Sequence, residues 1–234
     1  MNGLILLMAL SSPDAHAWSH TFGVWERNNL PLEWYFGTSR EDGVLSPDEA
    51  ESIIESAFGV WVDDMACANL STEPQGSLDF AISPNQAIGD GLSTQFLNQT
   101  WADVPGVDEG VLAVAICPQG NEALFNFDGE TYHPMVDCDI FLNCNRDWTS
   151  NSRIRSGVCN GEYSLDAVAT HEIGHLWGLG HSCDDPNDDG RKGDEPCDAG
   201  DLRDAIMYWS VGPCDPGPDG GFTSDDEDLS LIHI

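Results

Sequence analysis

The pattern of apolar and polar residues predicts one helix, several strands and then a second helix. Residues 46–49 (Ser-Pro-Asp-Glu) have the features of a helix start: a serine N-cap, a proline in the first turn and a glutamate three residues on. Apolar residues then recur at helical spacing from Ile53 to Trp61. Residues 83–110 are rich in Gly, Pro, Asn and Asp, which predicts mostly loops. Four segments are predicted to be strands: residues 32–36, 78–82, 111–117 and 136–142.

The second predicted helix carries the strongest chemical signal in the chain. Its residues His171 and His175 are spaced i and i+4, so they lie on one helix face and can bind one metal ion. Glu172 lies beside the first ligand, close enough to contact a metal-bound water. Gly178 favours the end of the helix because glycine tolerates the left-handed conformation, and His181 can then return as a third ligand. Three protein ligands leave one position for water, as in catalytic zinc sites.

These residues fit H-E-x-x-H-x-x-G-x-x-H, and the pattern resembles the metzincin signature of zinc peptidases. Met207 and Tyr208 resemble the methionine turn that lies beneath the zinc in that group. Within the metzincins, the chain is most similar to the matrixins, which include the matrix metalloproteinases and many bacterial relatives. Three further segments agree: residues 166–170 resemble the start of the zinc helix, 137–143 the strand that borders the cleft, and 224–226 the start of the last helix.

The resemblance implies a secreted zinc endopeptidase that hydrolyses peptide bonds in proteins. His171, His175 and His181 would hold the zinc. Glu172 would take a proton from zinc-bound water as the general base and deliver it to the leaving amine.

The resemblance also implies a fold and further roles. The fold is α/β: a twisted mixed sheet with the zinc helix, an irregular lower part after His181, and a cleft between them. Met207 would support the zinc by packing, and Tyr208 would form part of the wall of the substrate pocket. The substrate would lie extended along an edge strand at residues 137–143.

The ends of the chain carry two separate predictions. Residues 4–10 are apolar and precede Ala15-His16-Ala17, which predicts a signal peptide at residues 1–17; a short buried helix is the alternative. The remaining residues 18–228 form one catalytic domain of sufficient length for a hydrophobic core. Codons for residues 229–234 resemble a transposon end used in sequencing libraries, so we expect this segment to be an adapter artefact that replaces the last helix.

Eight cysteines and a secretion signal predict disulfide bonds in an oxidising compartment. Their spacing leaves many connectivities open, and Cys138–Cys144 and Cys183–Cys197 are candidate local pairs.

The net charge of −33 disfavours binding to nucleic acid and to anionic membranes, because both would repel the protein. No segment after the leader is apolar for the ~20 residues that a membrane helix needs. We therefore expect an extracellular monomer whose partners are protein or peptide substrates.

A second metal is suggested by the acidic segment that follows His181. Asp185, Asn187 and Asp189 match the first half of a calcium loop, D-x-N-x-D-G. Pro196 occupies the position where a bidentate glutamate is expected, so a solvated acidic loop is the stronger interpretation.

Two rivals to the peptidase remain: a secreted binding protein that keeps zinc without catalysis, and a calcium-stabilised surface module. The intact Glu172 argues against the first of them.

Overall fold

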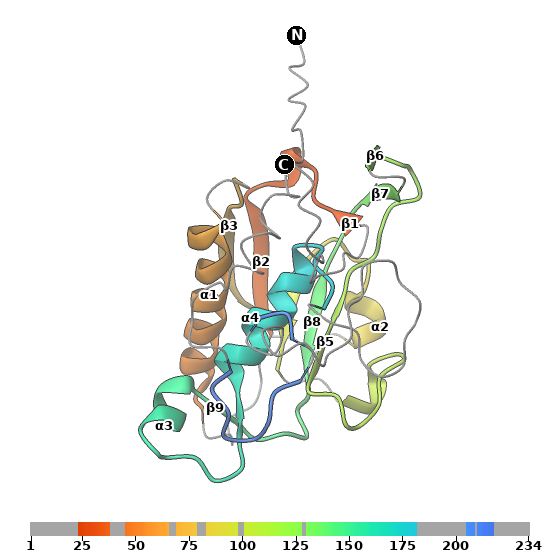
Figure 1. Cartoon of the computed structure of the whole chain (residues 1–234). Helices are drawn as coiled ribbons and strands as arrows, with labels where there is room; N and C mark the ends of the chain where they lie inside the picture. Colours follow the sequence, from red (N-terminus) through yellow and green to blue (C-terminus); the bar gives the residue numbers. More distant parts are fainter. Residues whose placement is uncertain are drawn as a thin grey trace.

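The computed structural model describes residues 23–37, 45–65, 69–78, 83–97, 101–127, 130–181, 205–208 and 210–217. Their centre is a five-stranded sheet in the order β3-β2-β4-β8-β5 (Figure 1). All neighbours in it are parallel except β5, which is antiparallel to β8. The strands are β2 (Leu32–Gly37), β3 (Thr72–Leu78), β4 (Ser93–Phe96), β5 (Ala113–Ile116) and β8 (Asp139–Leu142).

Two long helices, α1 (Pro47–Asp64) and α4 (Leu165–Leu176), pack against each other on one side of this sheet (Figure 1). The predicted start of α1 is confirmed: Ser46 and Glu49 form a capping box in which each side chain accepts the other's backbone N–H. Buried side chains from both helices and the sheet form the main core, which includes Trp34, Phe36 and Trp61. A smaller cluster contains Phe96 and Phe141, which stack at 5.1 Å.

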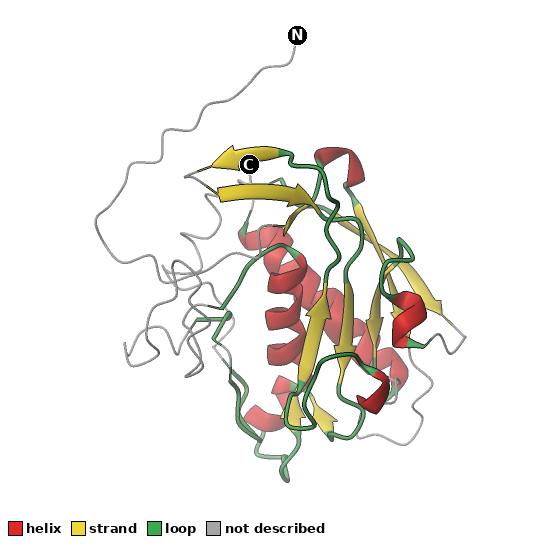
Figure 2. Cartoon of the chain, turned by 90° about the vertical axis from the view of Figure 1, so that its right-hand side faces the viewer, coloured by secondary structure: helices red, strands yellow, loops and turns green. Residues whose placement is uncertain are grey.

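Shorter elements surround this centre. Two further sheets, β1-β7-β6 and β10-β9, lie outside it, and β6 and β7 form a hairpin beyond one end of the main sheet (Figure 2). Their strands are β1 (Gly23–Val24), β6 (Phe125–Phe127), β7 (Glu130–Pro134), β9 (Trp148–Thr149) and β10 (Tyr163–Ser164). The short helices are η1 (Arg27–Asn29), α2 (Pro84–Ala87), η3 (Trp101–Asp103) and α3 (Asn151–Arg155).

The α/β class is confirmed, but the sequence did not predict all the strands of the main sheet. Of the strand expected at residues 78–82, only Leu78 is described, and it ends β3, which begins at Thr72; residues 79–82 lie outside the described residues. Residues 83–110, expected to be mostly loops, are mostly irregular where they are described, but they also contain α2, η3 and the central strand β4. The sequence hides β4 because its residues Ser93, Thr94 and Gln95 are polar yet fully buried between two other strands.

The expected edge strand is also wrong. Residues 137–143 include β8, which lies inside the sheet between β4 and β5. The edge strand is β5. The chain reverses after β5, and β8 then runs antiparallel to β5 on one side and parallel to β4 on the other.

Register explains the disulfides. Ile116 pairs with Asp139 across the β5–β8 ladder, so Cys117 and Cys138 stand opposite each other and form a disulfide. The candidate disulfide between Cys138 and Cys144 is therefore wrong, because Cys138 is bonded to Cys117. A second disulfide joins Cys159 to Cys214, 55 residues apart in sequence.

Several predictions lie outside the described residues: the signal peptide, the Cys183–Cys197 pair, the calcium loop and the adapter segment at residues 229–234. Among the helices that are described, none has the length and apolar character needed to span a membrane.

Two buried carboxylates lie at the start of β8. Asp139 accepts a hydrogen bond from the Thr94 backbone N–H (3.1 Å), and Asp137 accepts one from the Gly89 N–H (2.8 Å). Each has one oxygen without a hydrogen-bond partner among the described residues. Burial, and then the charge of Asp137, raise the pKa of Asp139 from 3.8 to about 8. The folded protein favours the protonated form of Asp139, whereas the unfolded chain ionises it at about pH 4. The free energy of unfolding therefore falls as pH rises from about 4 towards 8.

The substitution Asp139→Asn should therefore stabilise the protein at pH 8 and have much less effect at pH 4. Asparagine keeps an oxygen for the Thr94 N–H and cannot ionise. We expect a gain on the order of 2 kcal/mol at pH 8, measured by urea unfolding in calcium-free buffer at both pH values. The exposed Asp103→Asn is the control and should not change the pH profile. Parallel pH profiles for Asp139→Asn and the original chain would contradict the argument.

Candidate metal centre

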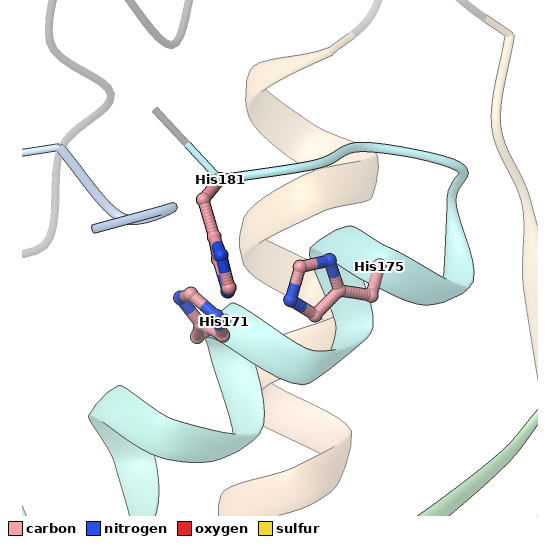
Figure 3. A group of neighbouring side chains, drawn as sticks. All are labelled: His171, His175 and His181. Atoms are coloured by element: carbon pink, nitrogen blue, oxygen red, sulfur yellow. The ribbon is translucent and has the colours of Figure 1, made fainter. Parts of the chain in front are cut away.

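Three histidine side chains converge at the C-terminal end of α4 (Figure 3). His171 and His175 come from α4, one turn apart, and His181 comes from the segment that follows the helix. One ligand nitrogen from each ring lies within 4.8 Å of the other two. The ring centroids are 4.7 to 5.2 Å apart. The structure thus brings together the three residues that the sequence selected.

Backbone carbonyls orient two of these rings. Nδ1 of His171 lies 2.9 Å from the Ile206 carbonyl oxygen, and Nδ1 of His175 lies 2.7 Å from that of Leu179. A carbonyl oxygen can only accept, so each Nδ1 carries the proton, and each Nε2 is left with a lone pair. Burial, and then the neighbouring histidines, hold the pKa of His171 well below its usual value. The His171 ring is therefore neutral, which is the form that binds a metal.

The turn after α4 determines where His181 lies. The helix ends at Leu176, and Gly178 has φ +93°, as predicted for a glycine at this position. The Leu179 N–H donates to the Gly174 carbonyl (3.1 Å) and the Gly178 N–H to the His175 carbonyl (2.9 Å). This pair of bonds is a Schellman motif, which reverses the chain and brings His181 back beside the helix.

Met207 packs against Gly174 in helix α4. It is fully buried, and a Cβ built on Gly174 would overlap Met207 Sδ and lie 2.8 Å from Trp61 Cζ2. The segment of residues 205–208 can therefore approach α4 this closely only because residue 174 has no side chain. Tyr208, which follows Met207, is partly buried, and its N–H donates to the Ala205 carbonyl (3.0 Å).

Glu172 is buried, with 6% of its surface exposed. Its carboxylate accepts a hydrogen bond from the backbone N–H of Ala115 on the edge strand β5, and its Oε2 has no hydrogen-bond partner among the described residues. Burial raises the pKa of Glu172 to about 8, and the Ala115 N–H acts in the opposite direction. A cation among the histidines would favour the ionised carboxylate.

Two tryptophans hold α4 in place. The Trp25 indole N–H donates to the Leu176 carbonyl and the Trp61 indole N–H to the Thr170 carbonyl, both at 2.8 Å. Trp61 was expected on the first helix, but its contact with α4, and those of Trp25 and Ala115, were not predicted from the sequence. The two tryptophan contacts span 151 and 109 residues, so no local pattern could reveal them. The candidate calcium ligands Asp185, Asn187 and Asp189 lie outside the described residues.

Fold and cluster together define a mixed α/β domain with a trihistidine site at the end of a helix. Residues 24–187 match the sequence profile of the family described as Matrixin. The chain belongs to the matrixin family, which implies zinc dependence.

Individual relatives agree. The chain is 26% identical to metalloendoproteinase 1 of Glycine max over 187 residues, which cover 77% of the chain and 46% of that protein. It is 29% identical to metalloendoproteinase 2-MMP of Arabidopsis thaliana over 68% of the chain and 34% of the relative. It is 28% identical to the hatching enzyme of Paracentrotus lividus over 94% of the chain and 28% of the relative. The chain thus spans less than half the length of these proteins.

The Gly174→Ala variant should be destabilised by about 1–3 kcal/mol, because the added methyl group overpacks the contact with Met207 and Trp61. The matched control is Gly59→Ala in α1, where a Cβ would meet nothing within 4 Å. This control should gain up to ~1 kcal/mol from helix propensity. Thermal unfolding of both variants tests the packing, and an equal effect of the two substitutions would refute it.

Proposed function

We propose that this domain is a secreted zinc metalloendopeptidase whose catalytic zinc is bound by His171, His175 and His181. The observation that carries the proposal is the convergence of three imidazoles next to a buried glutamate. Three nitrogen ligands suit zinc and leave a coordination position open, as catalytic rather than structural sites do.

Zinc bound there would act as a Lewis acid that polarises the scissile carbonyl and makes water a better nucleophile. Glu172 then takes the proton of the attacking water as the general base and delivers it to the leaving amine. The hydrogen bond from the Ala115 N–H holds the carboxylate in place for both transfers. Met207 supports the histidines from below, and Tyr208 contributes to the wall of the substrate pocket.

The substrate pairs with β5, the outermost strand of the main sheet, rather than with β8. An extended peptide that adds to this edge gains backbone hydrogen bonds along its length. It also passes Glu172, because the Ala115 N–H on the same edge contacts that carboxylate.

Secretion is supported by the two disulfides, which form and persist in oxidising compartments. A chain with the net charge of −33 also suits an extracellular protein that does not bind nucleic acid.

The substitution Glu172→Gln should lower kcat/KM by about 10²- to 10⁴-fold, the usual contribution of a general base. Zinc content, measured by mass spectrometry of the metal, should stay near one per chain because the histidines are unchanged. The assay is cleavage of a quenched fluorescent peptide library, and 1,10-phenanthroline should abolish it in the unsubstituted enzyme.

The matched control is Glu55→Gln, the same chemical change at an exposed position of α1, which should leave turnover unchanged. Retained proteolysis in Glu172→Gln would refute the role of the general base. No cleavage by a folded, zinc-loaded unsubstituted chain would favour a protein that binds zinc without catalysis.

A further inference from the structure

The edge that carries β5 continues beyond the metal centre. β5 is one of the two edge strands of the main sheet, and β6 is one of the two edge strands of the sheet β1-β7-β6. Both belong to one stretch of chain, residues 113–127. The returning stretch, residues 130–142, contains β7 and β8, which are the inner strands. β7 pairs with β1 in the smaller sheet, and β8 pairs with β4 in the main sheet.

Backbone hydrogen bonds join the two sheets into one ribbon. After the Cys117–Cys138 disulfide, the Val136 N–H donates to the Pro118 carbonyl (3.1 Å) and the Gly120 N–H to the Pro134 carbonyl (2.7 Å). The Leu124 N–H then donates to the Tyr132 carbonyl (2.8 Å) at the start of the hairpin. The hairpin turns towards the side of the sheet that carries α4 (Figure 2). We call the outer edge of residues 113–127 the docking strip.

Charge is scarce along the docking strip. Glu122 is its single charged residue, in a chain that contains 41 acidic residues. Edge strands usually carry charged side chains that prevent pairing with other polypeptides. The low charge of this edge therefore favours a strip that pairs with another chain.

An exposed apolar surface lies at the far end of the docking strip. Leu124 is 39% and Phe125 44% exposed, and Phe125 stacks on the buried Tyr132 at 4.8 Å. A rigid aromatic platform of this kind suits contact with an apolar side chain.

We propose that the docking strip binds the segment of a protein substrate that precedes the scissile bond, with an apolar residue of that segment against Leu124 and Phe125. The inference rests on the proposed function. A substrate strand adds antiparallel to β5, the more stable pairing, so its residues before the scissile bond run from Ala115 towards β6. Leu124 is nine positions after Ala115, a span of about 30 Å at ~3.3 Å per residue.

The expected occupant is an extended segment that is apolar and poor in acidic residues. A protein with a net charge of −33 repels acidic peptides, and an apolar side chain gains most from burial against Phe125.

The test compares three peptide substrates with the same cleavage sequence: a short one, one extended by ten residues on the amino side with a leucine near the ninth, and one extended equally on the carboxyl side. The full chain should cleave the amino-extended peptide with a kcat/KM about tenfold above the short one, mainly through a lower KM. Leu124→Asp should reduce this advantage to less than about twofold. Val158→Asp, which places the same charge at another exposed apolar position, should preserve the advantage.

Three results would overturn the docking strip: no advantage for the amino-extended peptide, an equal advantage for the carboxyl-extended one, or an advantage that survives in a folded Leu124→Asp variant. If the unsubstituted chain cleaves none of the peptides, the proposed peptidase function fails, but this result does not test the docking strip. Fluorescence anisotropy with the same peptides then decides: about tenfold tighter binding of the amino-extended peptide, lost in Leu124→Asp, supports the strip, and equal affinities refute it.

Discussion

The close approach of the segment of residues 205–208 to helix α4 is the constraint on which the candidate metal centre depends. Gly174 leaves the space that Met207 fills, and the same segment presents the Ile206 carbonyl to Nδ1 of His171. Protein interiors are packed densely enough that one additional methyl group must displace its neighbours. The orientation of His171 is thereby linked to packing against Gly174, about one turn further along the helix.

A second dependence joins the helix to the sheet. Glu172 is buried, yet its carboxylate receives an N–H from Ala115 on the outermost strand. A buried carboxylate without hydrogen bonds would be costly, so this contact also fixes β5 beside the metal centre. The Cys117–Cys138 disulfide joins the same strand to β8 two residues later. Strand β5, which pairs with the substrate in our proposal, is thus held by helix α4 through Glu172 and by the disulfide next to β8.

The surroundings of the site are less regular than its centre. Polar residues fill the central strand β4, and two carboxylates are buried at the start of β8. Such groups are tolerated because backbone N–H groups, including that of Thr94, satisfy some of their oxygens. The remaining oxygens make this part of the sheet sensitive to pH in a protein whose charge is already strongly negative.

The sequence by itself determined the features that depend on local spacing. The i, i+4 histidines, the glycine that ends α4 and the capping box of α1 all follow from interactions within a few residues. Only the tertiary structure decided that β5 rather than β8 forms the edge, that Cys138 pairs with Cys117, and that Trp25 and Ala115 contact helix α4. Strand order and such distant contacts depend on how whole elements pack, and a local pattern of residues does not contain that information.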